Sequence, residues 1–290
     1  MTNPAATDEF SISFEENEME RLRNSVIVPV VPVISRKEFV KMFARDYHAG
    51  QHVTFLGPSG RGKTKLMGQL LLAVLRYHKE ITARVLHGKI KNRDETIIKL
   101  SKDGKLPITA EATPSWWQKN VSHRDMRGYI VRPLTKPEGS PDSKEDLTEK
   151  ENQHLRRVFR RVIYKAYHAK RKHPVIVVVD EAHQAHTVLR LKSDCEGPLM
   201  RGRPVCGMWS LLQRGRFVSK MVYDQPEWVF IFHDPVIENQ RMYAEIGGVN
   251  PRVLVALSAR LQTHTASDGS TYSQCLAFRR SGDFLCIVDT

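Results

Sequence analysis

Apolar residues recur along this chain with two different periods, which predict strands alternating with helices. Continuous runs rich in β-branched and other apolar residues are typical of buried strands; they occupy residues 26–33, 52–56, 83–86 and 175–179. Helical spacing, with apolar residues three and four positions apart, extends over residues 35–50, 63–78 and 155–172. Strand, helix and strand in this order form the βαβ unit, so we expect an α/β fold built on a parallel sheet.

The first of these helices carries signals at both of its ends. Ser35 and Glu38 have the spacing of a capping box, in which each side chain binds a backbone N–H of the first turn. Gly50 is suited to end the helix, because glycine adopts the left-handed conformation found just past many helices. The pattern therefore places a helix between Ser35 and Gly50, directly before a strand.

Two segments lack the apolar residues that a folded core requires. The first twenty residues contain six acidic residues and no Lys or Arg, and residues 135–151 are almost entirely polar or charged. We therefore expect a flexible acidic tail over residues 1–24 and one folded domain over residues 25–290. A flexible polar insertion at residues 135–151 would interrupt that domain.

Composition and charge narrow the class of protein. The chain has 290 residues, 41% of them hydrophobic, and its 45 Lys and Arg against 32 Asp and Glu give a net charge of +13. No apolar run approaches the ~20 residues of a membrane-spanning helix, and a secretory signal pattern is lacking, so we expect a cytoplasmic protein without membrane insertion. Four cysteines without a Cys-x-x-Cys pair predict buried, reduced thiols. The basic charge indicates a polyanionic partner.

Residues 57–64 match the pattern G-x-x-x-x-G-K-[ST] between a predicted strand and a predicted helix. Glycines let backbone N–H groups curl around a phosphate, and the helix N-terminus adds its positive dipole end. The lysine of this motif reaches the β- and γ-phosphates, and the threonine hydroxyl binds Mg²⁺. The sequence thus predicts a site for ATP and Mg²⁺ formed by Gly57, Pro58, Ser59, Gly60, Arg61, Gly62, Lys63 and Thr64.

A second motif follows the apolar run at residues 175–179. A buried strand that ends in aspartate is the Walker B pattern, so we expect Asp180 to hold Mg²⁺. Glu181 comes next and is placed to act as general base toward the attacking water. His183 would either contact the γ-phosphate or serve as an ordinary structural histidine.

The segment after this motif resembles the FtsK/HerA superfamily of DNA-pumping ATPases. It contains Arg201-Gly202-Arg203, then residues 207–213 (GMWSLLQ), 218–234 (VSKMVYDQPEWVFIFHD) and 238–247 (ENQRMYAEIG). In that family a Gly-Arg element precedes a strand that ends in a sensor glutamine; another strand, a helix and a terminal hairpin, similar to residues 282–289, follow. The resemblance implies a RecA-like α/β P-loop NTPase fold with a mostly parallel central sheet, helices on both faces and an antiparallel C-terminal hairpin.

The same resemblance implies further site residues and an assembly. Gln213 would sense the γ-phosphate from a strand beside Asp180. Arg203 or Arg201 would be an arginine finger offered to a neighbouring subunit, which implies a homo-oligomeric ring, by resemblance a hexamer around DNA. The chain is most similar to packaging ATPases of double-stranded DNA viruses, in the host cytoplasm, or to motors of mobile elements, with a capsid or relaxase-type partner.

We therefore expect an ATP-hydrolysing ring motor that translocates double-stranded DNA through sequence-independent backbone contacts. Two alternatives stay open: an AAA+-type DNA-binding loader or transposition regulator, and a nucleotide-dependent binding switch without pumping. Basic residues around the helix at 155–172 would track DNA phosphates or form an ordinary solvated face; they are Arg156, Arg157, Arg160, Arg161, Lys165, Lys170, Arg171 and Lys172. Lys89, Lys91 and Arg93 are a second candidate set.

Overall fold

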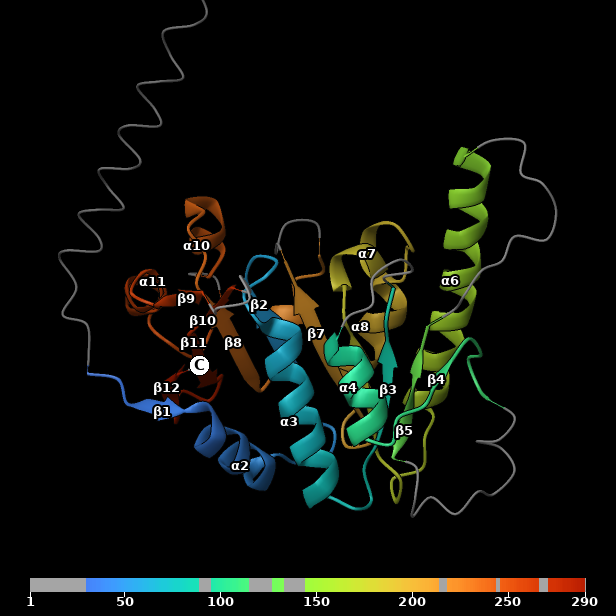
Figure 1. Ribbon diagram of the computed structural model, residues 1–290, viewed down its shortest axis with the longest axis horizontal. Coiled ribbons are helices and arrows are strands. Elements are labelled where there is room, and N and C mark those ends of the chain that lie inside the picture. Colours follow the sequence, from blue (N-terminus) through green and yellow to red (C-terminus); the bar gives the residue numbers. More distant parts are fainter. Residues whose placement is uncertain are drawn as a thin grey trace, which may run out of the picture.

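A ten-stranded sheet forms the centre of the molecule (Figure 1). The computed structural model describes residues 30–88, 95–114, 127–132, 144–213, 218–243, 246–265 and 271–289. The sheet has the strand order β1-β12-β11-β8-β2-β7-β6-β3-β5-β4. Its strands are β1 (Val33–Ser35), β2 (Val53–Leu56), β3 (Thr82–Leu86), β4 (Ile108–Thr109), β5 (Gly128–Val131), β6 (Val175–Val179), β7 (Cys206–Leu212), β8 (Trp228–Phe232), β11 (Cys275–Arg279) and β12 (Leu285–Asp289).

Most neighbouring strands in this sheet run parallel. All pairs from β8 through β2, β7, β6, β3 and β5 to β4 are parallel, whereas β11 is antiparallel to both β8 and β12. The predicted mostly parallel sheet with an antiparallel C-terminal hairpin is therefore confirmed. A separate two-stranded sheet contains β9 (Thr263–Thr265) and β10 (Thr271–Ser273).

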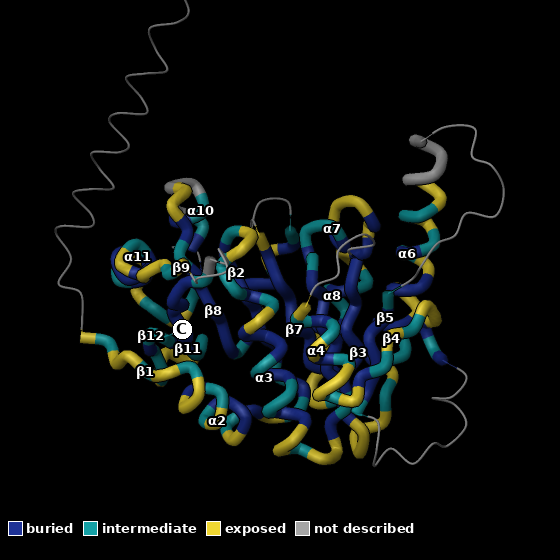
Figure 2. Tube along the Cα trace, in the orientation of Figure 1, coloured by how far each residue is buried: buried dark blue, intermediate teal, exposed yellow. Residues whose placement is uncertain are grey.

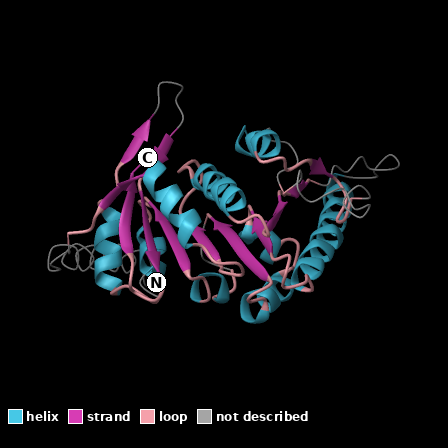
Figure 3. Cartoon of the chain, turned by 90° about the horizontal axis from the view of Figure 1, so that it is seen from below, coloured by secondary structure: helices cyan, strands magenta, loops and turns pink. Residues whose placement is uncertain are grey.

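Helices cover both faces of the sheet, as expected (Figures 1 and 3). Alternate residues of β2 enter the two cores: Phe55 packs with one set of helices and Leu56 with the other. The first face carries α2 (Arg36–Asp46), α3 (Lys63–Tyr77) and α4 (Glu95–Asp103). The second carries α6 (Lys144–Tyr167), α7 (Ala182–Thr187), α8 (Lys192–Arg201), α9 (Met221–Asp224), α10 (Ile237–Tyr243) and α11 (Pro251–Ala259). Because both faces are covered, the central strands are buried along their length (Figure 2).

The start of α2 confirms Ser35 as the N-cap, although Glu38 bonds the Ser35 hydroxyl and not its N–H; the end of the helix differs from the prediction. Ser35 Oγ accepts from the Glu38 backbone N–H at 3.3 Å and donates to the Glu38 carboxylate at 2.6 Å. The helix ends at Asp46, because Tyr47 leaves it in an extended conformation and buries its ring. Gly50 is not its C′ residue: with φ +88° it forms the turn before β2, where a side chain would collide with Pro204.

The expected loop over residues 135–151 is wrong in its second half. Helix α6 begins at Lys144, so these polar residues form its first turns, and Gln153 donates to Glu149 one turn earlier at 3.1 Å. The helix can be polar there because its apolar stripe packs against the sheet only from Leu155 onward. It also ends at Tyr167, five residues earlier than predicted, which leaves residues 170–172 in the turns before β6.

Several sequence predictions lie wholly or partly outside the described residues. These concern the acidic tail, the first four residues of the strand predicted at 26–33, residues 135–143, and the basic set Lys89, Lys91 and Arg93. All four cysteines are free and buried, and burial raises the pKa of Cys195, Cys206 and Cys286 to about 12. In the described part of the chain no helix has the length and apolarity to cross a membrane.

Candidate nucleotide-binding site

The glycine-rich loop lies between β2 and α3, at the carboxyl end of the parallel strands. Gly57, Gly60 and Gly62 have φ values of +141°, +76° and +88°, which residues with a Cβ rarely adopt. At Gly57 a Cβ would also lie 2.8 Å from the Cβ of Phe232, so the neighbouring strand β8 leaves room for glycine alone. The loop therefore bends tightly and brings its backbone amides to the N-terminus of α3, which favours an anion.

Lys63, the first residue of α3, holds its charge inside this loop. The side chain is buried, with 7% of the residue exposed, and Nζ donates to the carbonyl oxygens of Gly57 and Pro58 at 2.5 Å each. At the end of β8, burial and, secondarily, the charge of Arg61 lower the pKa of His233. A phosphate group that enters the loop would thus meet an ammonium group already in position.

The structure brings Thr64 and Asp180 together, although 116 residues separate them. Asp180 follows β6 and is 4% exposed, and the Thr64 hydroxyl donates to its Oδ1 at 3.3 Å. A hydroxyl and a carboxylate are the hard oxygen ligands that Mg²⁺ prefers, and Mg²⁺ in phosphate sites takes few ligands from the protein. The pair therefore fits a magnesium ion bound together with nucleotide phosphates.

Gln213 and Glu181 also meet at this edge. Strand β7 lies between β2 and β6, so its last residue, Leu212, brings Gln213 to the ends of both neighbours. Gln213 Nε2 donates to Glu181 Oε1 at 3.2 Å, and both residues line a cavity of about 290 Å³ that also includes His183. The strand order thus puts the sequence-predicted glutamine directly beside the predicted general base.

The two arginines of the Gly-Arg element lie elsewhere. Both precede β7, and because β7 runs parallel to β2 they lie at the opposite edge of the sheet from the loop of the same subunit. Arg203, half exposed, pairs with Glu227 at 2.5 Å and donates to the Gln225 carbonyl at 2.9 Å. Arg201 is exposed at the end of α8. The fold therefore does not bring either guanidinium to its own subunit's site.

His87 belongs to the site but was not among the sequence-predicted residues. It follows β3, the strand paired with β6, and Leu86 lies opposite Val179, so His87 and Asp180 leave the sheet side by side. Its Nδ1 lies 2.8 Å from Asp180 Oδ2, and the residue is 1% exposed. Because the ionised carboxylate can only accept, the imidazole donates and fixes its orientation. A polar residue after a buried strand was the available signal.

The β9–β10 hairpin is a second element that the sequence patterns missed. It packs beside the glycine-rich loop, where the Arg61 guanidinium donates to Thr263 at 3.4 Å and the Tyr272 Cβ lies 3.6 Å from the position of a Cβ on Gly62. The Lys65 ammonium lies 5.5 Å from the centre of the Tyr272 ring. The hairpin thus borders the first turn of α3, on the side of the loop away from β6.

Replacing His87 should weaken magnesium-dependent activity without disturbing the fold as a whole. We expect His87→Ala to raise the Mg²⁺ concentration for half-maximal ATP hydrolysis about 10-fold, since such orienting partners contribute 10- to 100-fold. A magnesium titration of the hydrolysis rate measures this, with the exposed His48→Ala as matched control. An unchanged magnesium dependence together with a lower melting temperature would mean that His87 is merely structural.

Comparison with known proteins supports the architecture. No family model and no curated protein sequence matches the chain. Among solved structures, the genome packaging NTPase B204 from Sulfolobus turreted icosahedral virus 2 is 14% identical, with 82% of this chain and 96% of that chain covered at a TM-score of 0.50. B204, the DNA-packaging ATPase from Sulfolobus turreted icosahedral virus, is 14% identical over 84% and 98% of the two chains, with a TM-score of 0.51. The chain therefore has the fold of these viral packaging ATPases, the P-loop fold that the resemblance to the FtsK/HerA superfamily implies.

Proposed function

We propose that this chain is an ATP-hydrolysing motor of the FtsK/HerA type that forms a ring and translocates double-stranded DNA. The observation that carries the proposal is the meeting of two pairs, Thr64 with Asp180 and Gln213 with Glu181, beside the glycine-rich loop. Together they supply a phosphate cradle, a magnesium site, a base and a polar sensor. The fold shared with two viral packaging ATPases supports the same reading.

In the proposed reaction the loop amides and Lys63 bind the β- and γ-phosphates of ATP. The Lys63 ammonium then exchanges its two carbonyl contacts within the loop for phosphate oxygens. Thr64 and Asp180 would hold Mg²⁺, which neutralises charge that develops on the phosphates. His87 keeps the Asp180 carboxylate in one orientation throughout.

Glu181 would accept a proton from the water that attacks the γ-phosphate. Its Oε1 is held by the Gln213 amide, so the orientation of the base depends on the end of β7. A change in the phosphate contacts of Gln213 would alter this bond. We infer that the glutamine thereby couples the γ-phosphate to the position of β7 and of the chain that follows it.

The arginine finger would be supplied by a neighbouring subunit. Arg201 and Arg203 lie across the sheet from their own loop, so either could complete only another copy's site, as in a ring with sites between subunits. Arg201 is exposed, whereas Arg203 would first have to leave Glu227. By resemblance the ring is a hexamer around DNA.

The partner would be duplex DNA, bound through its backbone. The net charge of +13 favours a polyanion, and the viral relatives in fold are packaging ATPases. The setting would be genome packaging beside a capsid, or transfer of mobile-element DNA beside a relaxase-type partner. Of the basic helix face, Arg160 is bound to Asp194 of α8 by three contacts of 3.0–3.1 Å, which leaves Arg157 and Arg161 as its exposed members.

DNA-stimulated ATP hydrolysis tests this function. We expect duplex DNA of random sequence to raise the hydrolysis rate several-fold, and the DNA concentration for half-maximal stimulation to rise steeply with salt because binding releases counterions. Steady-state phosphate release at several salt concentrations measures both effects. A hydrolysis rate that does not change when DNA is added, or no hydrolysis at all, would contradict the proposed motor.

A further inference from the structure

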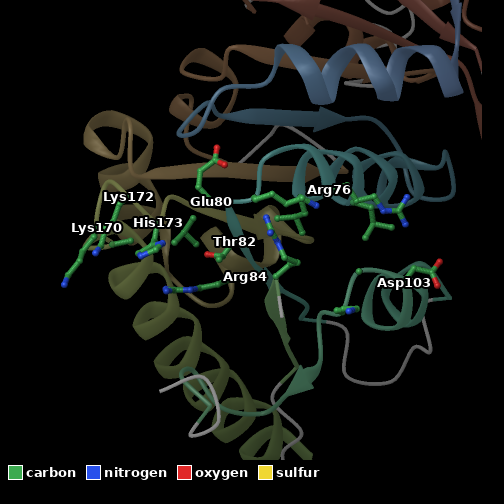
Figure 4. Close-up of a pocket in the computed structure, with 16 residues that line it drawn as sticks. Arg76, Glu80, Thr82, Arg84, Asp103, Lys170, Lys172 and His173 are labelled. Atoms are coloured by element: carbon green, nitrogen blue, oxygen red, sulfur yellow. The ribbon is translucent and has the colours of Figure 1, made fainter. Parts of the chain in front are cut away.

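Two adjoining hollows form a groove over the outer face of α3, away from the nucleotide site. One, of about 1180 Å³, lies between α2 and α4. The other, of about 850 Å³, continues beneath the starts of β3 and β5 to the turns after α6 (Figure 4). Both are lined by Leu72, Arg76 and Asp103, so they adjoin along α3. We call the two hollows together the basic groove.

Positive charge dominates the basic groove. In Figure 4, Lys170, Lys172 and His173 lie on one side of the second hollow and Arg76 on the other. The acidic residues in its lining are Glu80 and Asp103. The first hollow has the same bias, with Lys37, Lys41, Arg45 and Lys99 in its walls.

Arg84 gives the groove a buried cation. It is 9% exposed, Nη1 donates to the Val162 carbonyl at 3.2 Å, and within the described part of the chain Nε has no hydrogen-bond partner. The Nε of Arg127, in the same hollow, also lacks a partner among the described residues. The Arg84 guanidinium also lies 5.9 Å from the centre of the Tyr129 ring. Because two guanidinium groups lie in this hollow, the groove is suited to a negatively charged occupant.

The floor of the groove is apolar. Leu72, Leu75 and Val175 line the second hollow, and Val40 and Met42 line the first. A bare phosphate backbone gains nothing from such a floor. A peptide that combines acidic with large apolar residues matches both the charged rim and the apolar floor.

The chain itself contains such a peptide. Residues 8–20 read DEFSISFEENEME, with six acidic residues, four large apolar ones and no Lys or Arg. The described chain begins at residue 30, and Arg36, the first residue of α2, already lines the groove. The ten residue steps from residue 20 to residue 30 span up to about 35 Å when extended, so the linker is long enough to bring the segment to the groove beside Arg36.

We propose that the acidic segment, residues 8–20, docks in the basic groove. Its carboxylates neutralise the rim, and Phe10, Ile12, Phe14 and Met19 cover the floor. Because the segment is tethered next to the groove, its effective concentration there is on the order of millimolar, and modest intrinsic affinity suffices. High salt weakens the docking because the rim charges are exposed. The inference does not depend on the proposed function.

Photo-crosslinking in the full-length chain tests this docking. With benzoylphenylalanine in place of Phe14, we expect cross-links to map to groove peptides that contain Leu72 or Met42. Lys41→Glu combined with Arg76→Glu, both at exposed positions, should lower the yield at least about fivefold. Adding Glu15→Lys and Glu16→Lys should restore it, since the charges are then exchanged.

Arg171→Glu is the matched control, because it reverses an exposed charge next to the groove at a residue outside its lining. It should leave the yield unchanged. Cross-links between two chains, identified by mass, would support the same occupant supplied by a neighbouring copy. Cross-links outside the groove would overturn the proposal. So would a cross-linking yield that Lys41→Glu combined with Arg76→Glu leaves unchanged. If Lys41→Glu combined with Arg76→Glu lowers the affinity for duplex DNA but leaves the cross-linking yield unchanged, the groove binds DNA and not the acidic segment.

Discussion

Glu181→Gln is expected to lower the rate of ATP hydrolysis at least about 100-fold while ATP binding stays within about threefold. The amide keeps the size of the side chain and can still bond Gln213, but it cannot accept a proton from water; such a base contributes 10²–10⁴-fold. Single-turnover hydrolysis and equilibrium nucleotide binding, measured on the same preparation, separate the two effects.

The exposed Glu111→Gln is a suitable control, because it makes the same chemical change in a loop outside the site. It should hydrolyse ATP at the unaltered rate. If Glu181→Gln retains most of the activity, the base is another residue. If it loses nucleotide binding to the same extent as hydrolysis, Glu181 holds the site together and does not act on the water.

Lys63→Ala should weaken ATP binding at least about 100-fold. Each charge-assisted hydrogen bond to a phosphate is worth about 1.5–3 kcal/mol, and the lysine would contact two phosphates. Lys65→Ala removes the same charge from an exposed position two residues along α3 and should bind ATP within a few-fold of the unaltered chain. Calorimetric titration with a non-hydrolysable nucleotide measures both variants, and equal affinities would contradict the role of Lys63.

Mixing experiments with Lys63→Ala identify which arginine is the finger. A Lys63→Ala subunit lacks a working loop but still carries its arginines, so it should restore part of the activity of a finger-deficient subunit in a mixed ring. We expect rescue when it is mixed with either Arg201→Ala or Arg203→Ala, whichever removes the finger. If neither mixture exceeds the sum of its components, neither arginine acts in a neighbouring site.

The glycine-rich loop and its partners show how far sequence alone reaches. Local chemistry placed Gly57 to Thr64 between a strand and a helix, and the β-branched run before Asp180 identified a second strand end; the structure confirms both positions. These signals are local, because each depends on neighbours along the chain. The position of Gln213 on a strand beside Asp180 is what the family resemblance implies, and the strand order, with β7 between β2 and β6, agrees with it. Its hydrogen bond to Glu181 is not among the sequence predictions, because it depends on that strand order.

Features that depend on tertiary contacts escaped the sequence patterns. His87 belongs to the site only because β3 pairs with β6, which places its side chain beside Asp180. Gly50 looked like a helix terminator, yet the burial of Tyr47 ends α2 earlier and the glycine instead makes room for Pro204. The polar start of α6 has no apolar period, so composition alone indicated a loop there.

The basic groove is a further case of this kind. Its cationic residues come from α2, α3, α4, β3 and the turns after α6, and no sequence window contains more than a few of them. The sequence pattern predicts the basic run at residues 170–172 as one end of a helical face. In the structure Lys170 and Lys172 instead line a hollow at the edge of the sheet opposite the nucleotide site.

Triplex displacement tests the proposed motor most directly. A duplex with a third strand bound at increasing distances from a loading end is mixed with protein and ATP, and release of the third strand is followed by fluorescence. We expect release that requires ATP, begins after a delay proportional to the distance, and is abolished by Glu181→Gln. If the protein hydrolyses ATP in response to DNA while the third strand stays bound at every distance, the chain loads or switches on DNA without translocating along it.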